Sequence, residues 1–278
     1  MHALQIVWDP SKGIDLGFFT LHYYSLMWIV AFILGLQIMK RIYKNENQTE
    51  DSLDSLFIYA VVGIMVGARL GHVIFYQSEL ITQDFFSIFL PFRFNPEFEF
   101  TGFQGLASHG AAIGMIIAMY LYNKKVLHKS VLWILDRVVI PVASGAVFVR
   151  IGNFINSEIV GKPTDASYGV IFKQNEENFG RHAAQLYEAG LYVFVFLILL
   201  YFYWKTKKSE QQGFLFGLFL LLLMTIRFFV EFVKEPQNPE PGAEEWLFGW
   251  NTGQMLSIPF ILIGLYFMFI YRPKKPAM

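Results

Sequence analysis

Cysteine is absent from this chain of 278 residues. Its absence excludes a disulfide, a thiolate metal site and a cysteine nucleophile, and cysteine usage indicates no redox compartment. Charge is also scarce, since Asp, Glu, Lys and Arg make up 16% of the residues, compared with about a quarter in soluble domains. Lys and Arg together number 22, as do Asp and Glu. The net charge therefore favours neither nucleic acid nor an acidic partner.

Apolar residues take the place of charge, and they lie in long blocks. Hydrophobic residues are 55% of the chain, and Phe alone supplies 30. The blocks are roughly 18 to 22 residues long, close to the ~20 that cross a ~30 Å hydrocarbon core. They predict an all-α polytopic membrane protein with seven transmembrane helices, at about 22–39, 55–76, 107–122, 131–149, 186–204, 213–231 and 254–271. Residues 1–19 lack a basic segment followed by an apolar run, so we expect no cleaved signal peptide.

The loops between these blocks differ in their basic residues. Twelve Lys and Arg follow the first, third, fifth and seventh blocks, whereas six lie in the longer alternate segments. The positive-inside rule then predicts an N-terminus outside the cytoplasm and a cytoplasmic C-terminus. Two outer segments, about 77–106 and 151–185, are long enough to form a small extracytoplasmic cap, and 168–172 is a candidate short strand. No repeats are present, so we predict a single membrane-embedded domain over 1–278.

Ionisable residues inside the blocks need a partner, a wet cavity or a function, because charge at bilayer depth is costly. Arg69 and His72 are three residues apart on one helix face, beside glycines that allow close helix approach. Helix packing, with the arginine reaching to the interface, is the alternative. His109 opens the third block, where a lone histidine is more often structural than catalytic. Adjacent Asp136 and Arg137 are interpreted as a local anchor.

The outer end of the fourth block concentrates polar residues where a phospholipid head group would lie. Arg150, Asn153, Asn156 and Glu158 fall within nine residues. Such a run is more specific than the random polar mixture that solvation alone would need.

The fifth and sixth blocks add polar groups toward the same outer side. The fifth begins with His182, Gln185, Tyr187 and Glu188. The sixth ends with Arg227 and Glu231, an i,i+4 pair that could also be a purely structural ion pair. Tyr24 and His109 lie at outer ends as well, so these groups can converge at one depth. Arginines in a partly wet, low-dielectric cavity suit a phosphate, since guanidinium binds it through two hydrogen bonds and keeps its proton.

These residues resemble the prolipoprotein diacylglyceryl transferase family. The run RIGNFINSEIVG at 150–161 is similar to the family's signature Arg-x-Gly-Asn-Phe-x-Asn-x-Glu-x-x-Gly. Further matches follow in order along nearly the whole chain: YYSLM at 23–27, GARLG at 67–71, SHG at 108–110, HAAQLYE at 182–188, RFFVEF at 227–232 and GQMLSIP at 253–259. The chain departs from the family at Ala111 and Val149, where glycine is usual, and at 183–184, where Pro-Ser is usual. These departures change small or turn residues and leave the charges in place.

The resemblance implies an enzyme that moves the sn-1,2-diacylglyceryl group of phosphatidylglycerol to the thiol of the lipobox cysteine of a preprolipoprotein. A thioether forms and glycerol phosphate is released. The implied partners are phosphatidylglycerol and a preprolipoprotein that carries its signal peptide, and no cofactor is implied. The implied location is the bacterial cytoplasmic (inner) membrane, with the active site facing the outer leaflet, and we expect a monomer.

The resemblance also implies roles for individual residues. His109 suits a general base by its ordinary pKa of ~6.5, and Arg150 and Arg227 would neutralise the departing phosphate. The expected substrate-binding residues are Tyr24, Arg69, Asn153, Asn156, Glu158, His182, Gln185, Tyr187, Glu188 and Glu231. No metal is implied, because no tight set of carboxylate and histidine ligands occurs.

Two other classes of protein are alternatives to a transferase. A transporter or channel would use the buried charges as a solute path, and would normally place them near the midplane on broken helices, often in inverted repeats. The sequence has neither feature. A non-catalytic scaffold leaves the cost of several intramembrane arginines unexplained. The sequence leaves open whether His109 removes the thiol proton or positions the lipid head group, and which residues contact the acceptor.

Overall fold

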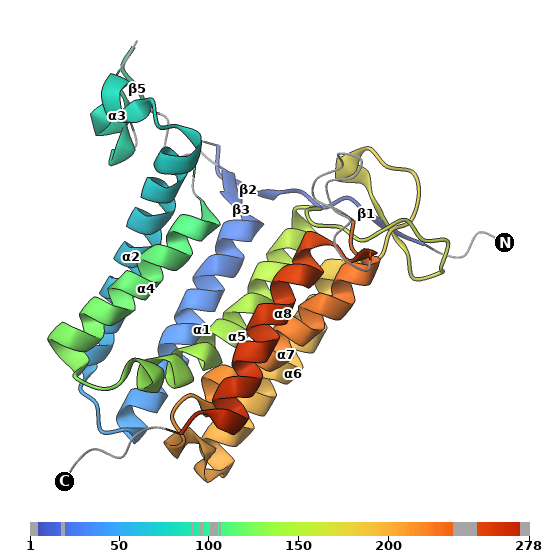
Figure 1. The fold of residues 1–278 in the computed structure, drawn as a ribbon. Helices are drawn as coiled ribbons and strands as arrows, with labels where there is room; N and C mark the ends of the chain where they lie inside the picture. The colour runs from blue at the N-terminus through green and yellow to red at the C-terminus, as the bar shows by residue number, and fades with distance from the viewer. Residues whose placement is uncertain are drawn as a thin grey trace, which may run out of the picture. The chain divides into compact units, whose positions relative to one another are not determined.

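The computed structural model describes residues 5–17, 20–90, 92–94, 97–100, 105, 107–235 and 249–272. The chain is mostly helical and divides into two compact units, which are described separately (Figure 1). The first unit comprises Met1–Met39 and Leu135–Met278, and the second comprises Lys40–Ile134.

Five long helices belong wholly or largely to the first unit. They are α1 (Tyr23–Asn45), α5 (Val131–Ile155), α6 (Ala184–Lys205), α7 (Phe214–Val230) and α8 (Thr252–Leu265). Single turns extend or join three of them: η4 (Lys207–Glu210), η5 (Glu231–Val233) and the π-helical turn η7 (Tyr266–Ile270). Helix α7 packs against both α6 and α8 (Figure 1). Helix α1 packs against α5 through small residues, since a Cβ at Gly145 would lie 3.6 Å from that of Ala31.

Six helices are long and apolar enough to cross a membrane, so the chain is a multi-pass membrane protein. They span Tyr23–Asn45, Glu50–Tyr76, Val131–Ile155, Ala184–Lys205, Phe214–Val233 and Thr252–Ile270. Each coincides with one of the predicted spans. Helix α5 continues to Ile155, beyond the predicted end at 149, and so Arg150 and Asn153 lie on its last turns rather than in a loop.

The remaining predicted span, at 107–122, is occupied by a shorter helix. Helix α4 (Ser108–Tyr122) has 15 residues, which at about 1.5 Å each cover roughly 23 Å. The π-helical turn η2 (Asn123–Leu127) follows it without a break. Helix α4 is therefore shorter than the ~20 residues that usually cross a membrane. The seventh crossing and the orientation of the termini therefore stay predictions.

The second unit is built on a close crossing of α2 (Glu50–Tyr76) with α4. Glycines face each other across it, and a Cβ added to Gly110 would lie only 2.2 Å from the carbonyl oxygen of Gly67. Only glycine permits this approach, as in other membrane helix pairs. The short elements of this unit are α3 (Leu80–Gln83), η1 (Phe85–Ile88) and the antiparallel pair β4 (Phe92–Arg93) and β5 (Glu99–Phe100).

Small sheets and a buried cluster form the loop region of the first unit. Strand β1 (Ile6–Trp8) pairs in parallel with β6 (Val170–Phe172), and β2 (Gly13–Asp15) pairs with β3 (Thr20–His22). The short strand predicted at 168–172 is thus present over its last three residues, and it is followed by η3 (Lys173–Asn175). Trp8 donates its indole N–H to the carbonyl of Phe154 at 3.1 Å. This contact fixes the N-terminal strand against the end of α5.

Arg181 holds the loop that follows α5. Its guanidinium forms two hydrogen bonds with Glu177, at 2.6 and 2.7 Å, and one with Glu235 at 2.8 Å. A further bond reaches the carbonyl oxygen of Gly161 at 3.1 Å. The hydrogen bond that Arg181 donates to Glu177 raises the pKa of Arg181 further, so this guanidinium stays charged at any physiological pH. The loop is therefore tied to the segment after α7.

The pair interpreted as a local anchor joins α5 to the start of α7. Asp136 is fully buried and accepts hydrogen bonds from the backbone N–H groups of Gly213 (2.7 Å) and Phe216 (2.9 Å). Arg137 donates to the carbonyl of Ser209 at 3.2 Å. Asp136 thus satisfies N–H groups that the first turn of α7 cannot pair within the helix.

Candidate active site

Arg150 and Glu188 form the tightest ion pair of the first unit's polar cluster. Arg150 lies near the end of α5 and Glu188 near the start of α6. The guanidinium Nε is 2.7 Å from the Glu188 carboxylate, and the two side chains are 15% and 1% exposed. Arg150 also donates to the amide oxygen of Asn153 at 3.3 Å, one helical turn further on. A carboxylate buried this deeply requires such a partner.

Glu158 lies at the exposed edge of the same cluster. Its carboxylate accepts from the side-chain amides of Asn153 (3.3 Å) and Asn156 (2.9 Å). Its backbone carbonyl accepts from Gln185 at 2.6 Å. The signature run is therefore the end of a helix followed by a turn that brings Glu158 back toward Asn153.

Backbone strain accompanies this turn. Ser157 and Ile159 both have φ of 55°, a left-handed conformation that is uncommon outside glycine and unfavourable for a β-branched side chain. The hydrogen bonds made by Asn153, Asn156 and Gln185 to Glu158 are the contacts that hold it. Strained backbone of this kind is common at functional sites, and it persists where the surrounding contacts hold the strained conformation in place.

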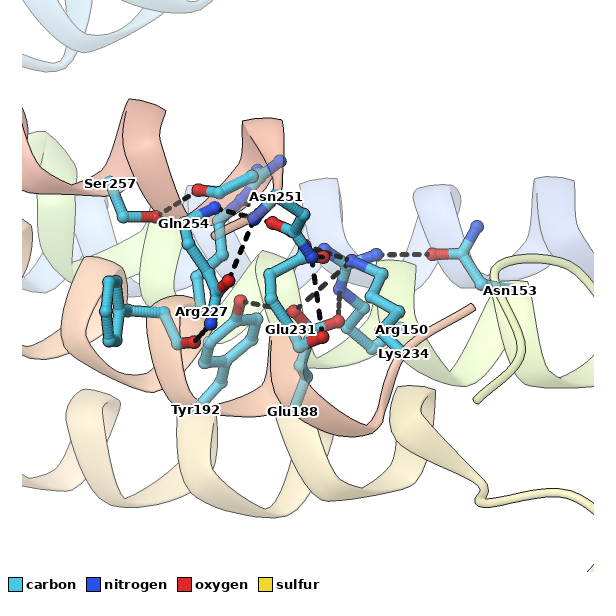
Figure 2. Close-up of polar contacts among 12 residues, drawn as sticks. Arg150, Asn153, Glu188, Tyr192, Arg227, Glu231, Lys234, Asn251, Gln254 and Ser257 are labelled. Atoms are coloured by element: carbon cyan, nitrogen blue, oxygen red, sulfur yellow. Dashed lines mark hydrogen bonds and ion pairs between the residues drawn. The ribbon is translucent and has the colours of Figure 1, made fainter. Parts of the chain in front are cut away.

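A second set of charges lies at the end of α7. The Lys234 ammonium is 2.9 Å from the Glu231 carboxylate and 3.9 Å from that of Glu188, and its side chain is 4% exposed. Arg227 approaches Glu231 only to 3.9 Å, and its side chain is 39% exposed. Figure 2 shows these groups in one continuous network from Arg227 through Glu231, Lys234 and Glu188 to Arg150. The structure thus brings Arg150 and Arg227 into one network.

Backbone pairing positions Lys234. The segment after α7 runs antiparallel to the turn after α5, with Gly161 opposite Lys234. The N–H of Lys162 donates to Val233 at 2.8 Å, and the N–H of Glu235 donates to Val160 at 3.1 Å. Gly161 has no space for a side chain, since a Cβ there would lie 2.5 Å from His182. The signature glycine therefore allows the close approach that places the lysine.

The charges of the network do not cancel. Arg150, Arg227 and Lys234 are cations, and Glu188 and Glu231 are the two buried carboxylates. With all five groups ionised, their net charge is +1. The exposed Glu158 is not included in this sum. Tyr192 adds a neutral hydroxyl that donates to Glu188 at 3.4 Å. A phosphodiester monoanion would complete the charge balance, and it would do so where water screening is weak.

Three other predicted residues of this unit lie apart from the network. The His182 Nδ1 is 3.3 Å from the Tyr187 hydroxyl, and both residues line a groove of about 610 Å³ with Tyr168 and Leu186. Tyr24 packs its ring against the backbone of α5, 2.6 Å from where a Cβ of Gly152 would lie. None of the three has a hydrogen bond or ion pair with the network in the described part of the chain.

Two predicted residues belong to the second unit. Arg69 donates to the carbonyl oxygens of Ser87 (2.7 Å), Ile88 (3.0 Å) and Gly105 (3.4 Å), and so it holds the loop between α2 and α4. His109 is the second residue of α4, and its side chain lies outside the described residues. Their proposed roles stay predictions.

Sequence reasoning missed three contributors to the network: Lys234, Tyr192 and Asn251. Lys234 is one of the six basic residues of the longer alternate segments, and its position three residues after Glu231 is a signal that the sequence offers. Tyr192 lies one turn after Glu188 on α6. Asn251 precedes Gln254 by three residues, which is the spacing of a capping box. In the part of the chain described, no three His, Asp or Glu side chains are arranged to hold a metal ion.

The fold and the site define a class: a multi-pass membrane protein with a buried cationic cluster suited to an anionic head group. The family model of the prolipoprotein diacylglyceryl transferases matches residues 12–270. The chain therefore belongs to the prolipoprotein diacylglyceryl transferase family, and it is a transferase.

Curated relatives from the same family match the sequence of this chain over nearly their whole length. The phosphatidylglycerol–prolipoprotein diacylglyceryl transferase of Bacteroides fragilis is 38% identical over 275 residues, covering 98% of this chain and 97% of the relative. The enzyme of the same name from Tolumonas auensis is 40% identical over 267 residues, covering 96% and 97%. That of Chloroherpeton thalassium is 36% identical over 273 residues, covering 98% and 96%.

Proposed function

We propose that this protein transfers the diacylglyceryl group of phosphatidylglycerol to the lipobox cysteine of a preprolipoprotein, the first step of bacterial lipoprotein maturation. The printed names of its relatives support the donor and the acceptor. The observation in this chain that carries the proposal is the network that joins Arg150 to Arg227 with one positive charge in excess. A phosphodiester is the anionic group of phosphatidylglycerol.

The reaction exchanges a carbon–oxygen bond for a carbon–sulfur bond. The cysteine thiolate attacks the sn-3 carbon of the diacylglyceryl group, and the bond between this carbon and the phosphate oxygen breaks. The oxygen keeps the electron pair and leaves as glycerol phosphate, while the thiol proton passes to a base. His109 fits the base, because the ordinary pKa of histidine is ~6.5 and that of a thiol is ~8.5. The acceptor supplies the nucleophile, as this chain has no cysteine.

The arginines of the cluster bind the phosphate, and the other residues of the cluster hold the site in position. Arg227 and Arg150 neutralise the charge that develops on the leaving phosphate, and in a site poor in water each such contact contributes a few kcal/mol, about 2.7–4 in a measured example. Asn153, Asn156, Glu158 and Gln185 hold the turn that positions Arg150. Glu188 orients Arg150 at 2.7 Å, whereas Glu231 pairs with Lys234 and lies 3.9 Å from Arg227.

The remaining predicted residues are assigned to substrate contacts, each within its own unit. Tyr24 lies against α5 beside Asn153 and suits a donor to the head group. His182 and Tyr187 line a groove with apolar walls, and Arg69 orders the loop before α4. These assignments rest on the family motifs together with the positions of the residues.

The placement in the membrane follows from the distribution of charge. We propose seven crossings, with the span at 107–122 that α4 occupies as the third, the N-terminus outside and the C-terminus in the cytoplasm. The protein would then lie in the bacterial cytoplasmic membrane as a monomeric single domain, with Arg150 and Arg227 beneath the outer leaflet's surface. A transporter is not favoured, because the family that the chain belongs to and its named relatives are transferases.

Purified protein, phosphatidylglycerol and a synthetic lipobox peptide provide the test. Mass spectrometry should detect the peptide with one diacylglyceryl group attached through its thiol. An otherwise identical peptide with serine in place of cysteine is the control, and it should remain unmodified. Absence of the thioether product with the wild-type protein would refute the proposed function.

A further inference from the structure

One asparagine connects the start of α8 to the cationic network. The Asn251 side-chain oxygen accepts a hydrogen bond from the backbone N–H of Gln254 at 2.8 Å and so caps the helix. Its amide nitrogen points the other way, toward Glu231, at 3.2 Å from the carboxylate and 3.5 Å from the backbone carbonyl (Figure 2). A single side chain therefore serves both helix capping and the site carboxylate.

The Glu231 carboxylate is held from several sides. Lys234 binds one oxygen at 2.9 Å, and Asn251 binds the other at 3.2 Å. Gly253 forms a third wall, because a Cβ there would lie 2.6 Å from the carboxylate carbon. With both oxygens engaged, the carboxylate stays 3.9 Å from the Arg227 guanidinium.

This arrangement determines what Arg227 can bind. Residues four apart on a helix form ion pairs readily, so an unrestrained Glu231 would close on Arg227. The Arg227 side chain is 39% exposed, and the ion pair it makes among the described residues is the 3.9 Å approach to Glu231. The guanidinium thus retains donors for an incoming phosphate.

We infer that Asn251 is a positioning residue for the donor phosphate. By binding Glu231 and anchoring it to the start of α8, Asn251 keeps this carboxylate on Lys234 and away from Arg227. The inference rests on the proposed function, since it assigns the phosphate of phosphatidylglycerol to Arg227. Asn251 itself touches no substrate in this account and acts through Glu231.

Two substitutions separate positioning from helix capping. Asp, Ser and Asn cap helices about equally well, so Asn251→Asp and Asn251→Ser both preserve the start of α8. Asn251→Asp puts a second carboxylate against Glu231 and repels it toward Arg227. Asn251→Ser removes the amide donor without adding charge, so its effect should be the smaller one.

The expected result is a change in KM for phosphatidylglycerol at nearly constant stability. Loss of the hydrogen bond to Glu231 predicts a KM about threefold higher for Asn251→Ser, and the added repulsion between carboxylates predicts a KM about tenfold higher or more for Asn251→Asp. Thermal unfolding midpoints of both variants should stay near that of the wild type. A KM for Asn251→Asp within twofold of the wild-type value, at unchanged stability, would overturn the inference.

A double variant in which residues 251 and 231 exchange their amide and carboxylate groups provides a stricter test. In the double variant Asn251→Asp with Glu231→Gln, the amide and the carboxylate exchange places while the net charge is unchanged. The double variant should have a KM closer to the wild-type value than Asn251→Asp alone. If the effects of the two substitutions multiply, the contact between residues 251 and 231 is not what matters. Each comparison requires an active wild-type protein, so failure of the proposed function would be evident separately.

Discussion

The two ends of the cationic network use the same residue types in different ways. At one end Arg150 is 2.7 Å from Glu188 and 15% exposed, while at the other Arg227 is 3.9 Å from Glu231 and 39% exposed. The difference arises from the neighbours: Glu188 relies mainly on Arg150, whereas Glu231 is held by Lys234 and Asn251. We therefore propose that Arg150 belongs to the framework as well as to the site, and that Arg227 binds the ligand.

The largest expected effect is that of Arg150→Ala. This change leaves the Glu188 carboxylate buried, with Lys234 3.9 Å away as its nearest cation, and breaking a buried pair typically costs about 3–5 kcal/mol. We expect loss of both stability and transferase activity, measured by thermal unfolding and by the peptide assay. The double variant Arg150→Ala with Glu188→Gln should recover stability and remain inactive. Recovery of activity in the double variant would contradict a role of Arg150 at the phosphate.

Arg227→Ala should separate activity from stability. Glu231 keeps its contacts with Lys234 and Asn251, so the unfolding midpoint should change little. Activity should fall by about 100-fold or more, the usual effect of losing one donor to a transition-state oxyanion. Arg227→Lys is the matched control, since it keeps the charge but loses the paired hydrogen bonds, and it should retain more activity than the alanine variant. Equal activity of the Arg227→Ala variant and the wild type would show that Arg227 does not take part in the reaction.

Lys234→Met tests the part of the network that distinguishes the two ends. The change preserves the length of the side chain and removes the cation that Glu188 and Glu231 share. Arg227 then becomes the nearest cation to Glu231, so the KM for phosphatidylglycerol should rise by roughly tenfold, which corresponds to about 1.4 kcal/mol. Lys234→Arg should stay close to the wild-type KM. Equal KM values for the methionine and arginine variants would show that the charge at 234 is unimportant.

The smallest effect on activity is expected away from the network, at Asp136. Asp136→Ala leaves the N–H groups of Gly213 and Phe216 without their acceptor, at a cost of about 1–3 kcal/mol. Unfolding should occur at lower temperature, while the KM and kcat of the folded protein stay near their wild-type values. A selective loss of activity without destabilisation would contradict its interpretation as an anchor.

The helices were predictable from the sequence because long apolar blocks have few alternatives in a bilayer. Six predicted spans coincide with long apolar helices. The block at 107–122 was harder to judge, because its α-helix ends at Tyr122 and the continuation carries Lys124 and Lys125. Spacing in the sequence also could not show that α5 continues through Asn153.

The site was predictable where its residues form local patterns. The run from Arg150 to Glu158 indicated a polar cluster, and in the structure its members contact one another. Lys234 and Asn251 were missed because their contacts depend on the pairing of segments far apart in the chain. Arg69 gave a charged-residue signal, but the backbone carbonyls that its guanidinium meets have no sequence signature.

An experimental structure with phosphatidylglycerol bound is the most direct test of the central claim. The account predicts that the lipid phosphate lies within about 2.7–3.0 Å of the Arg227 guanidinium nitrogens, with the Arg150–Glu188 and Lys234–Glu231 pairs still intact. A phosphate bound away from both arginines, or Glu231 paired tightly with Arg227 in the complex, would contradict it.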